Sequence, residues 1–166
     1  VKGFSLTLDR RRTNNLEINA TYTLQFADGS GSDANSSNGI NNRGPIRNLI
    51  PLSFDERHRI TAVLDYRYGS GKSYNGPKIG GINILEDFGI NLTSFLVSGQ
   101  PYSRSLNPQA FGGTGYVGSV NGARLPWNFT TDLNIQKRFP VTINKTSSKK
   151  LWFNAYFRVQ NVFNTL

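Results

Sequence analysis

The residues Leu16 to Phe26, LEINATYTLQF, decide the fold, because apolar and polar side chains alternate there without exception. Alternation of period two is typical of a β-strand with one face toward an apolar environment and the other toward water. The apolar face would carry Leu16, Ile18, Ala20, Tyr22, Leu24 and Phe26, and the polar face Glu17, Asn19, Thr21, Thr23 and Gln25. The pattern therefore predicts one continuous strand over this stretch.

Five other stretches alternate in the same way. They cover residues 1–10, 59–68, 88–100, 127–139 and 151–163. In the third of these the alternation slips near Ser94, where we expect a β-bulge. The chain therefore predicts six antiparallel strands and an all-β fold.

Strand length separates two kinds of sheet. Strands of soluble proteins usually hold about five or six residues, whereas a tilted strand that crosses a membrane needs about 9–11. The alternating stretches reach or exceed the membrane length. A polar face suits a solvent-facing sheet or a wet barrel lumen equally well, so length decides. We expect an antiparallel transmembrane β-barrel, of which residues 1–166 form a partial domain of about six consecutive strands.

Composition agrees with strands and polar loops and excludes other classes. Hydrophobic residues make up 37%, aromatic residues 12%, and 17 residues are Gly. Without Cys, neither a disulfide framework nor a thiolate metal site can form. The net charge of +9 raises nucleic acid as a partner, but the basic residues cluster at strand ends and form no basic helix or stripe. The sequence contains no run of about 18 apolar residues, so it predicts no membrane-spanning helix.

The connections alternate in length. Residues 11–15 and 140–150 are short connections, while 27–58 and 101–126 are long and rich in Gly, Ser or Asn. Outer-membrane barrels have short periplasmic turns and long external loops. We therefore place the basic turns in the periplasm and the long loops outside, although the segment 69–87 is longer than we expect for a periplasmic turn. Aromatic residues near the strand ends suit the girdles of such barrels: Phe26, Tyr68, Trp127, Phe139 and Phe163.

Three motifs carry a family resemblance. Residues 48–69, NLIPLSFDERHRITAVLDYRYG, resemble the FDxRH turn and following strand of TonB-dependent receptors. Residues 98–102, SGQPY, resemble the SGxPY element of that family, and residues 158–164, RVQNVFN, resemble its V-x-N-L-F-N/D element near the end of the penultimate strand. In order and spacing these motifs resemble the C-terminal part of Oar-like receptors, a Bacteroidota-type branch.

The resemblance implies a function and partners. It implies a receptor or transporter of about 22 strands with a plugged lumen, located in the outer membrane of a Gram-negative bacterium, that takes up substrate with energy delivered by the TonB complex. Because the chain holds no Met and begins inside an alternating pattern, we expect a fragment that lacks the plug and the closing strand. The implied partners are outer-membrane lipid and lipopolysaccharide, the protein's own plug, TonB and other envelope proteins. The substrate and its binding residues are not indicated.

Two other classes remain open. One is a structural or adhesive barrel that transports nothing and belongs to a larger envelope complex. The other is a soluble β-sandwich that binds a ligand, which predicts solubility without detergent. We expect no enzyme and no cofactor, because no set of nucleophile, base and orienting residue can be assembled.

Individual motifs favour ordinary structural roles. Residues 113–118, GTGYVG, match a dinucleotide fingerprint but lack the strand and helix that it requires. Gly71-Lys72-Ser73 resembles the end of a phosphate loop, yet Tyr66 stands where its first Gly should be, which favours a turn. His58 is the only histidine; we expect it to organise the start of its strand through hydrogen bonds and ion pairs rather than to act as a general base.

Two groups of charged residues are candidates for binding. One projects from the predicted polar face, where we expect lumen solvation and cross-strand pairing rather than contact with a plug or substrate: Asp65, Arg67, Asp132, Arg138 and Arg158. The other lies in the predicted external loops, where contact with anionic ligands or lipopolysaccharide phosphates competes with simple solvation: Arg43, Arg47, Arg104 and Arg124.

Overall fold

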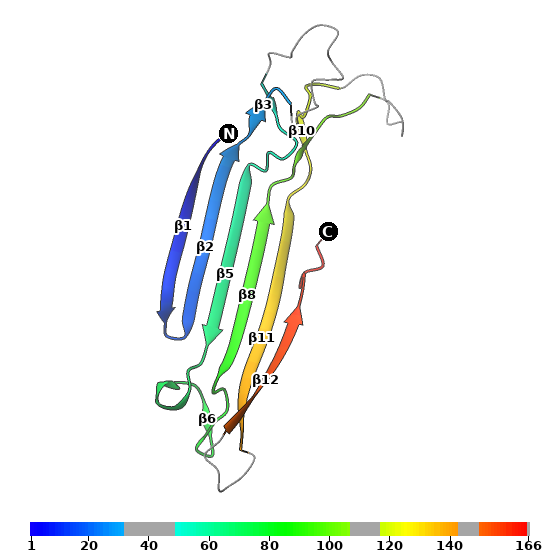
Figure 1. The fold of residues 1–166 in the computed structure, drawn as a ribbon. Coiled ribbons are helices and arrows are strands. Elements are labelled where there is room, and N and C mark those ends of the chain that lie inside the picture. Colours follow the sequence, from blue (N-terminus) through cyan, green and yellow to red (C-terminus); the bar gives the residue numbers. More distant parts are fainter. Residues whose placement is uncertain (32–48, 107–116, 143–149, 166) are drawn as a thin grey trace. The chain divides into compact units, whose positions relative to one another are not determined.

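The computed structural model describes residues 1–31, 49–106, 117–142 and 150–165 and shows an all-β protein. Six long strands form one antiparallel sheet in the order β1-β2-β5-β8-β11-β12, so each long strand pairs with the next one along the chain (Figure 1). Their bounds are Lys2–Thr13 (β1), Leu16–Phe26 (β2), His58–Arg67 (β5), Phe88–Val97 (β8), Asn128–Thr142 (β11) and Lys150–Val159 (β12). The described residues do not close into a barrel. None of their helical segments is long and apolar enough to cross a membrane.

Three small two-stranded sheets lie in the connections. They pair β3 (Asp28–Gly29) with β4 (Ile50–Pro51), β6 (Lys78–Ile79) with β7 (Ile82–Asn83), and β9 (Pro101–Tyr102) with β10 (Ala123–Arg124). One short 3-10 turn, η1 (Gly71–Ser73), follows β5. The turn that we predicted over these three residues is thus confirmed.

The six predicted strands are confirmed, with differences at their ends. The strand predicted over 151–163 stops at Val159, because Asn161 turns into the left-handed region with a φ of 49°. The Asn161 amide donates to Asp132 Oδ1 at 2.9 Å, and its side chain exchanges hydrogen bonds with the backbone of Thr165. Asn tolerates this backbone conformation better than most residues. The Asn of the RVQNVFN motif therefore terminates the strand.

The bulge expected near Ser94 is wrong. The amide of Tyr68 bonds to the carbonyl of Phe88, and the amide of Ser98 bonds to the carbonyl of His58. The two bonds span equal lengths of β5 and β8, so neither strand holds an extra residue between them. The Ser94 hydroxyl meets the Thr131 hydroxyl at 3.0 Å, as uninterrupted alternation requires.

An extra residue lies in β1 instead. Asn14 and Asn15, with φ of 51° and 73°, form a two-residue turn that places Arg12 opposite Glu17, and their side chains bond at 2.9 Å. Regular pairing from there would put Thr7 on the apolar face, yet its hydroxyl bonds to that of Thr21 at 3.2 Å. One unpaired residue between Thr7 and Arg12 reconciles the two pairings, which is the definition of a β-bulge.

Contacts group the described residues into two units. Unit 1 contains residues 1–6, 22–60 and 96–129. It holds the strand ends next to the hairpins β3–β4 and β9–β10, where Ala27, Leu52 and Val97 are buried. A Cβ at Gly99 would overlap the carbonyl oxygen of Leu125, so only Gly fits at this point of the SGQPY motif.

Unit 2 contains residues 7–21, 61–95 and 130–166. Tyr74 is its one buried apolar side chain among the described residues, and its hydroxyl joins the carbonyl of Pro77 to the amide of Leu85. These bonds organise the connection 69–87, which is therefore folded and not an open loop.

The sheet has an apolar face that no other part of the described chain covers. In unit 2 the register of β11 and β12 places Ile135 opposite Phe157 and Phe139 opposite Phe153. Phe157 is 63% exposed and Phe153 61%. The buried apolar residues of the described ranges lie at strand ends or in connections, so the middle of the sheet has no packed core.

Candidate functional site

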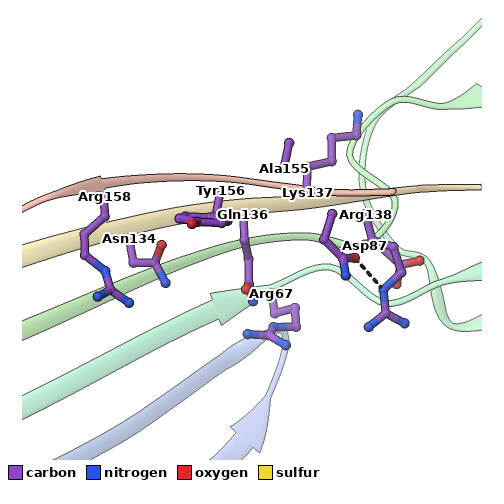
Figure 2. A pocket seen from close by; sticks show the side chains of 10 residues that line it. Arg67, Asp87, Asn134, Gln136, Lys137, Arg138, Ala155, Tyr156 and Arg158 are labelled. Atoms are coloured by element: carbon purple, nitrogen blue, oxygen red, sulfur yellow. Dashed lines mark hydrogen bonds between the residues drawn. The ribbon is translucent and has the colours of Figure 1, made fainter. Parts of the chain in front are cut away.

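A hollow of about 440 Å³ opens on the polar face of unit 2 (Figure 2). We call it the polar hollow; its lining includes Arg67, Asn134, Gln136, Arg138, Tyr156 and Arg158. Figure 2 shows Asn134, Gln136 and Arg158 pointing to one side of the sheet, while Lys137 and Ala155 point to the other. The hollow therefore belongs to the polar face that alternation predicts.

Strand register brings these side chains together. Asn134 lies opposite Arg158, Gln136 opposite Tyr156, and residues directly opposite in an antiparallel pair share a face. Gly89 of β8 lies beneath them: a Cβ there would lie 3.2 Å from Arg67 Nε and 3.4 Å from Gln136 Nε2. The missing side chain of Gly89 thus allows Arg67 and Gln136 to lie against the backbone of β8.

The polar hollow has polar side-chain atoms without partners. Arg67 Nη2 donates to Asp65 at 3.3 Å, but Arg67 Nε is buried and has no hydrogen-bond partner. The side-chain oxygen of Asn134 is buried and unpaired as well. Within the described ranges the Arg158 side chain makes neither a hydrogen bond nor an ion pair, whereas Arg138 Nε donates to Asn154 at 3.2 Å. Buried polar atoms without partners are rare and call for an explanation.

A second polar cluster of unit 2 pairs two acids, Glu17 and Asp65, with Arg12. The bond from the Arg67 amide to the Asn15 carbonyl places Asp65 opposite Glu17, so two carboxylates face each other. Arg12 donates to both, at 2.9 Å to Glu17 and 2.7 Å to Asp65. The bulge in β1 is what directs Arg12 to this face.

A buried carboxylate joins the loops of unit 1. Asp55, at 0% exposure, accepts hydrogen bonds from the Ala27 amide at 2.7 Å, from Arg57 Nε at 3.3 Å and from Arg124 Nη2. The other terminal nitrogen of Arg124 donates to the carbonyls of Asp55 and Gly99, at 2.6 and 3.2 Å. Burial raises the pKa of Asp55, but the bonds from Ala27, Arg124 and Arg57 and the charge of Arg124 outweigh it, so the pKa is lowered. We call these four residues the Asp55 clasp: Ala27, Asp55, Arg57 and Arg124.

Four ring side chains form a row across unit 1, which we call the aromatic row: Phe4, Tyr22, His58 and Trp127. The Tyr22 hydroxyl lies 2.9 Å from His58 Nδ1, and the His58 ring stacks on Trp127 with centroids 5.6 Å apart. Phe4 packs edge-on against Tyr22 at 6.0 Å. Alternation places Phe4, Tyr22 and His58 on the apolar face, so the row lies near one end of that face.

The structure confirms the predicted roles of some of the charged residues and contradicts others. The cross-strand pairing predicted for the polar face is confirmed for Asp65 and Arg138, while Arg158 has no such pair among the described residues. Simple solvation is wrong for Arg124, because the Asp55 clasp binds it. Arg104 is exposed beside Arg124, and Arg43 and Arg47 lie outside the described residues.

The predictions for the remaining motifs are confirmed only in part. His58 makes the predicted hydrogen bonds, since its amide also donates to Ser98 Oγ at 3.0 Å, but it forms no ion pair with the residues that the structure describes. Most of residues 113–118 lie outside the described ranges. Alternation along the sequence does not indicate the roles of Arg12 and Gly89, because these depend on the register of neighbouring strands. No family model, curated protein or solved structure matches the chain.

Proposed function

We propose that the chain forms part of the wall of an outer-membrane β-barrel that serves as a TonB-dependent receptor or transporter. The observation that carries the proposal is the exposed apolar face of a sheet whose opposite face is charged and hydrogen-bonded. In water such a face would be a liability for aggregation or would need a second layer. In a barrel wall the lipid covers it, and the polar face lines the lumen.

The aromatic residues support a membrane of ordinary thickness. Along β5, His58 and Tyr66 stand eight residues apart, which is about 26 Å of strand and about 19 Å of membrane depth at a tilt of about 45°. Trp127 and Phe139 stand twelve residues apart, or about 28 Å of depth by the same conversion. These values bracket the apolar band of about 25 Å in outer-membrane barrels.

Lys137 fits the edge of such a band. It lies on the apolar face opposite Ala155, yet its ammonium group donates to the carbonyl of Ile84 and lies 5.1 Å from the ring centroid of Phe139. A lysine on a lipid-facing surface is expected to extend its charge toward the interface in this way. The connection 69–87, which contains Ile84, would then lie at the membrane surface.

The receptor function rests on the motif resemblance, and the structure gives two of those motifs physical roles. Gly99 of SGQPY allows a backbone contact that no other residue permits, and Asn161 of RVQNVFN ends a strand. Substrate would bind at the external loops and pass through the lumen after the plug rearranges.

Spin labels at neighbouring positions test the wall. Because these 166 residues contain no Cys, the variants Leu133→Cys and Asn134→Cys each place one label in this segment of the full-length protein. In lipid bilayers the label at Leu133 should collide with oxygen and the label at Asn134 with a water-soluble nickel complex. Equal accessibility at both sites would contradict the barrel wall, and purification of the protein from the soluble fraction without detergent would favour the soluble β-sandwich.

Binding to TonB tests the receptor function separately. The full-length protein in detergent should bind the purified periplasmic domain of TonB, and a variant that lacks its N-terminal TonB-contacting segment should not. Alternating spin-label accessibility without any TonB binding would retain the barrel wall and favour the structural or adhesive alternative.

A further inference from the structure

We propose that the polar hollow binds an oxyanion, a carboxylate or phosphate group, between Arg67 and Arg158. The inference deepens the proposed function, on which it rests only in requiring that this face be accessible within the lumen. It assigns a ligand chemistry to residues that alternation alone marks as generally polar.

The charge balance of the hollow favours an anion. The guanidinium groups of Arg67, Arg138 and Arg158 line it together with a single carboxylate, that of Asp87. Asp65, the nearest acid on β5, is already shared between Arg12 at 2.7 Å and Arg67 at 3.3 Å. Within the lining of the hollow, the three guanidinium groups therefore outnumber the one carboxylate.

The polar groups that lack partners line the same hollow. A guanidinium group has donors on all three nitrogens, and Arg67 uses one terminal nitrogen for Asp65 while its buried Nε remains unpaired. Arg158 has its whole fork available, and that fork matches the two oxygens of a carboxylate or phosphate group. The Asn134 amide, whose oxygen is buried without a partner, can turn over and present its NH₂ group to the same anion.

The shape of the hollow depends on Gly89. A Cβ at this position would lie 3.2 Å from Arg67 Nε, a tight contact that requires the guanidinium group to shift slightly. The volume of about 440 Å³ lies within the range of small-molecule sites. Such an oxyanion has two sources: a free solute in the lumen, or an acidic side chain from another part of the same protein.

Citrate is the probe for a free solute. Calorimetry on the full-length protein in detergent, with chloride as the reference salt, should show citrate binding that Arg158→Gln weakens by at least about 10-fold, the loss expected for one charge-assisted bond. Gly89→Ala keeps the charge but should weaken binding roughly 3-fold or more by displacing Arg67. The matched control Lys72→Gln removes an exposed positive charge outside the hollow and should leave binding unchanged.

Photo-crosslinking distinguishes the second source. If an acidic side chain of the same protein fills the hollow, citrate will not bind, and benzoylphenylalanine in place of the exposed Tyr156 will form an intramolecular crosslink that Arg158→Gln abolishes. The proposal is overturned if neither citrate binding nor a crosslink occurs, or if Arg158→Gln and Gly89→Ala change neither. Heat-modified gel mobility verifies that each variant is folded. The spin-label alternation at Leu133 and Asn134 reports on the barrel wall independently of these results.

Discussion

Replacing Asp55 by Ala tests whether one buried carboxylate holds the loop ends of unit 1 together. The substitution removes the acceptor of three donors, which come from Ala27, Arg57 and Arg124. It leaves the paired backbone of the long strands untouched. We therefore expect a local loosening around β3 and β4 rather than loss of the whole fold.

The free-energy cost of Asp55→Ala depends on whether each of the three donors can bond to water once the carboxylate is gone. Ala27 is 1% exposed, so its amide would stay buried without an acceptor, at a cost of about 1–3 kcal/mol. The Arg124 side chain is 27% exposed and would lose a charge-assisted bond of about 1.5–3 kcal/mol. Arg57 reaches water and loses little. The sum, about 2.5–6 kcal/mol, includes the usual cost of breaking a buried ion pair, about 3–5 kcal/mol.

Hydrogen exchange on the full-length protein measures this cost. The Leu52 amide, which donates to the Ala27 carbonyl at 2.8 Å, should exchange roughly 100- to 5000-fold faster in Asp55→Ala. Peptides from the middle of β11 should keep their protection. Glu56→Ala is the matched control, because Glu56 makes only partly exposed contacts with Arg59 and Gln100 and should cost less than about 1 kcal/mol. Equal protection of Leu52 in the wild type and in Asp55→Ala would refute the clasp.

Three further perturbations follow from the geometry. The pKa of Asp55 is lowered below its ordinary value of 3.8. The carboxylate therefore contributes its full stabilisation above that pH, and the contribution is lost as the pH falls through the folded-state pKa. After correction for the intrinsic rate, exchange of the Leu52 amide should be unchanged from pH 7 to about 4.5 and should rise only below about 4. Asn14→Ala removes the short polar side chain that lets Asn tolerate a φ of 51° and should lower the free energy of unfolding by about 1 kcal/mol, whereas Asn14→Gly should be nearly neutral in the same urea titration. Trp127→Ala removes the end of the aromatic row and should lower the stability in lipid vesicles by about 1 kcal/mol, while Trp127→Phe retains most of it.

The strands and their two faces could be predicted because alternation is a local property. The prediction over 16–26 matches β2 residue for residue, and the predicted polar face reappears in the Thr7–Thr21 and Arg138–Asn154 contacts. Each residue of a strand needs only its neighbours in the chain to reveal which face it occupies. The composition of the connections likewise located the turns.

The Asp55 clasp could not be predicted, because its parts lie far apart in the sequence. Asp55 and Arg124 are separated by 69 residues, and no spacing rule links a loop acid to an arginine at that distance. The same holds for Gly99, whose need for a missing side chain comes from Leu125 near the far end of the same connection. Contacts of this kind depend on how loops meet, which alternation within strands does not describe.

Deleting Arg11 tests the bulge in β1, on which the position of Arg12 depends. If β1 holds one unpaired residue between Thr7 and Arg12, the deletion straightens the strand and preserves both the Arg12–Glu17 and the Thr7–Thr21 pairings. A spin label at Leu6 should then remain as accessible to oxygen as in the undeleted chain. A regular strand would respond in the opposite way, since removing one residue moves every side chain upstream of it to the other face. A label at Leu6 that becomes accessible to the nickel complex would therefore show that β1 has no bulge, and that Arg12 reaches Asp65 by the length of its side chain alone.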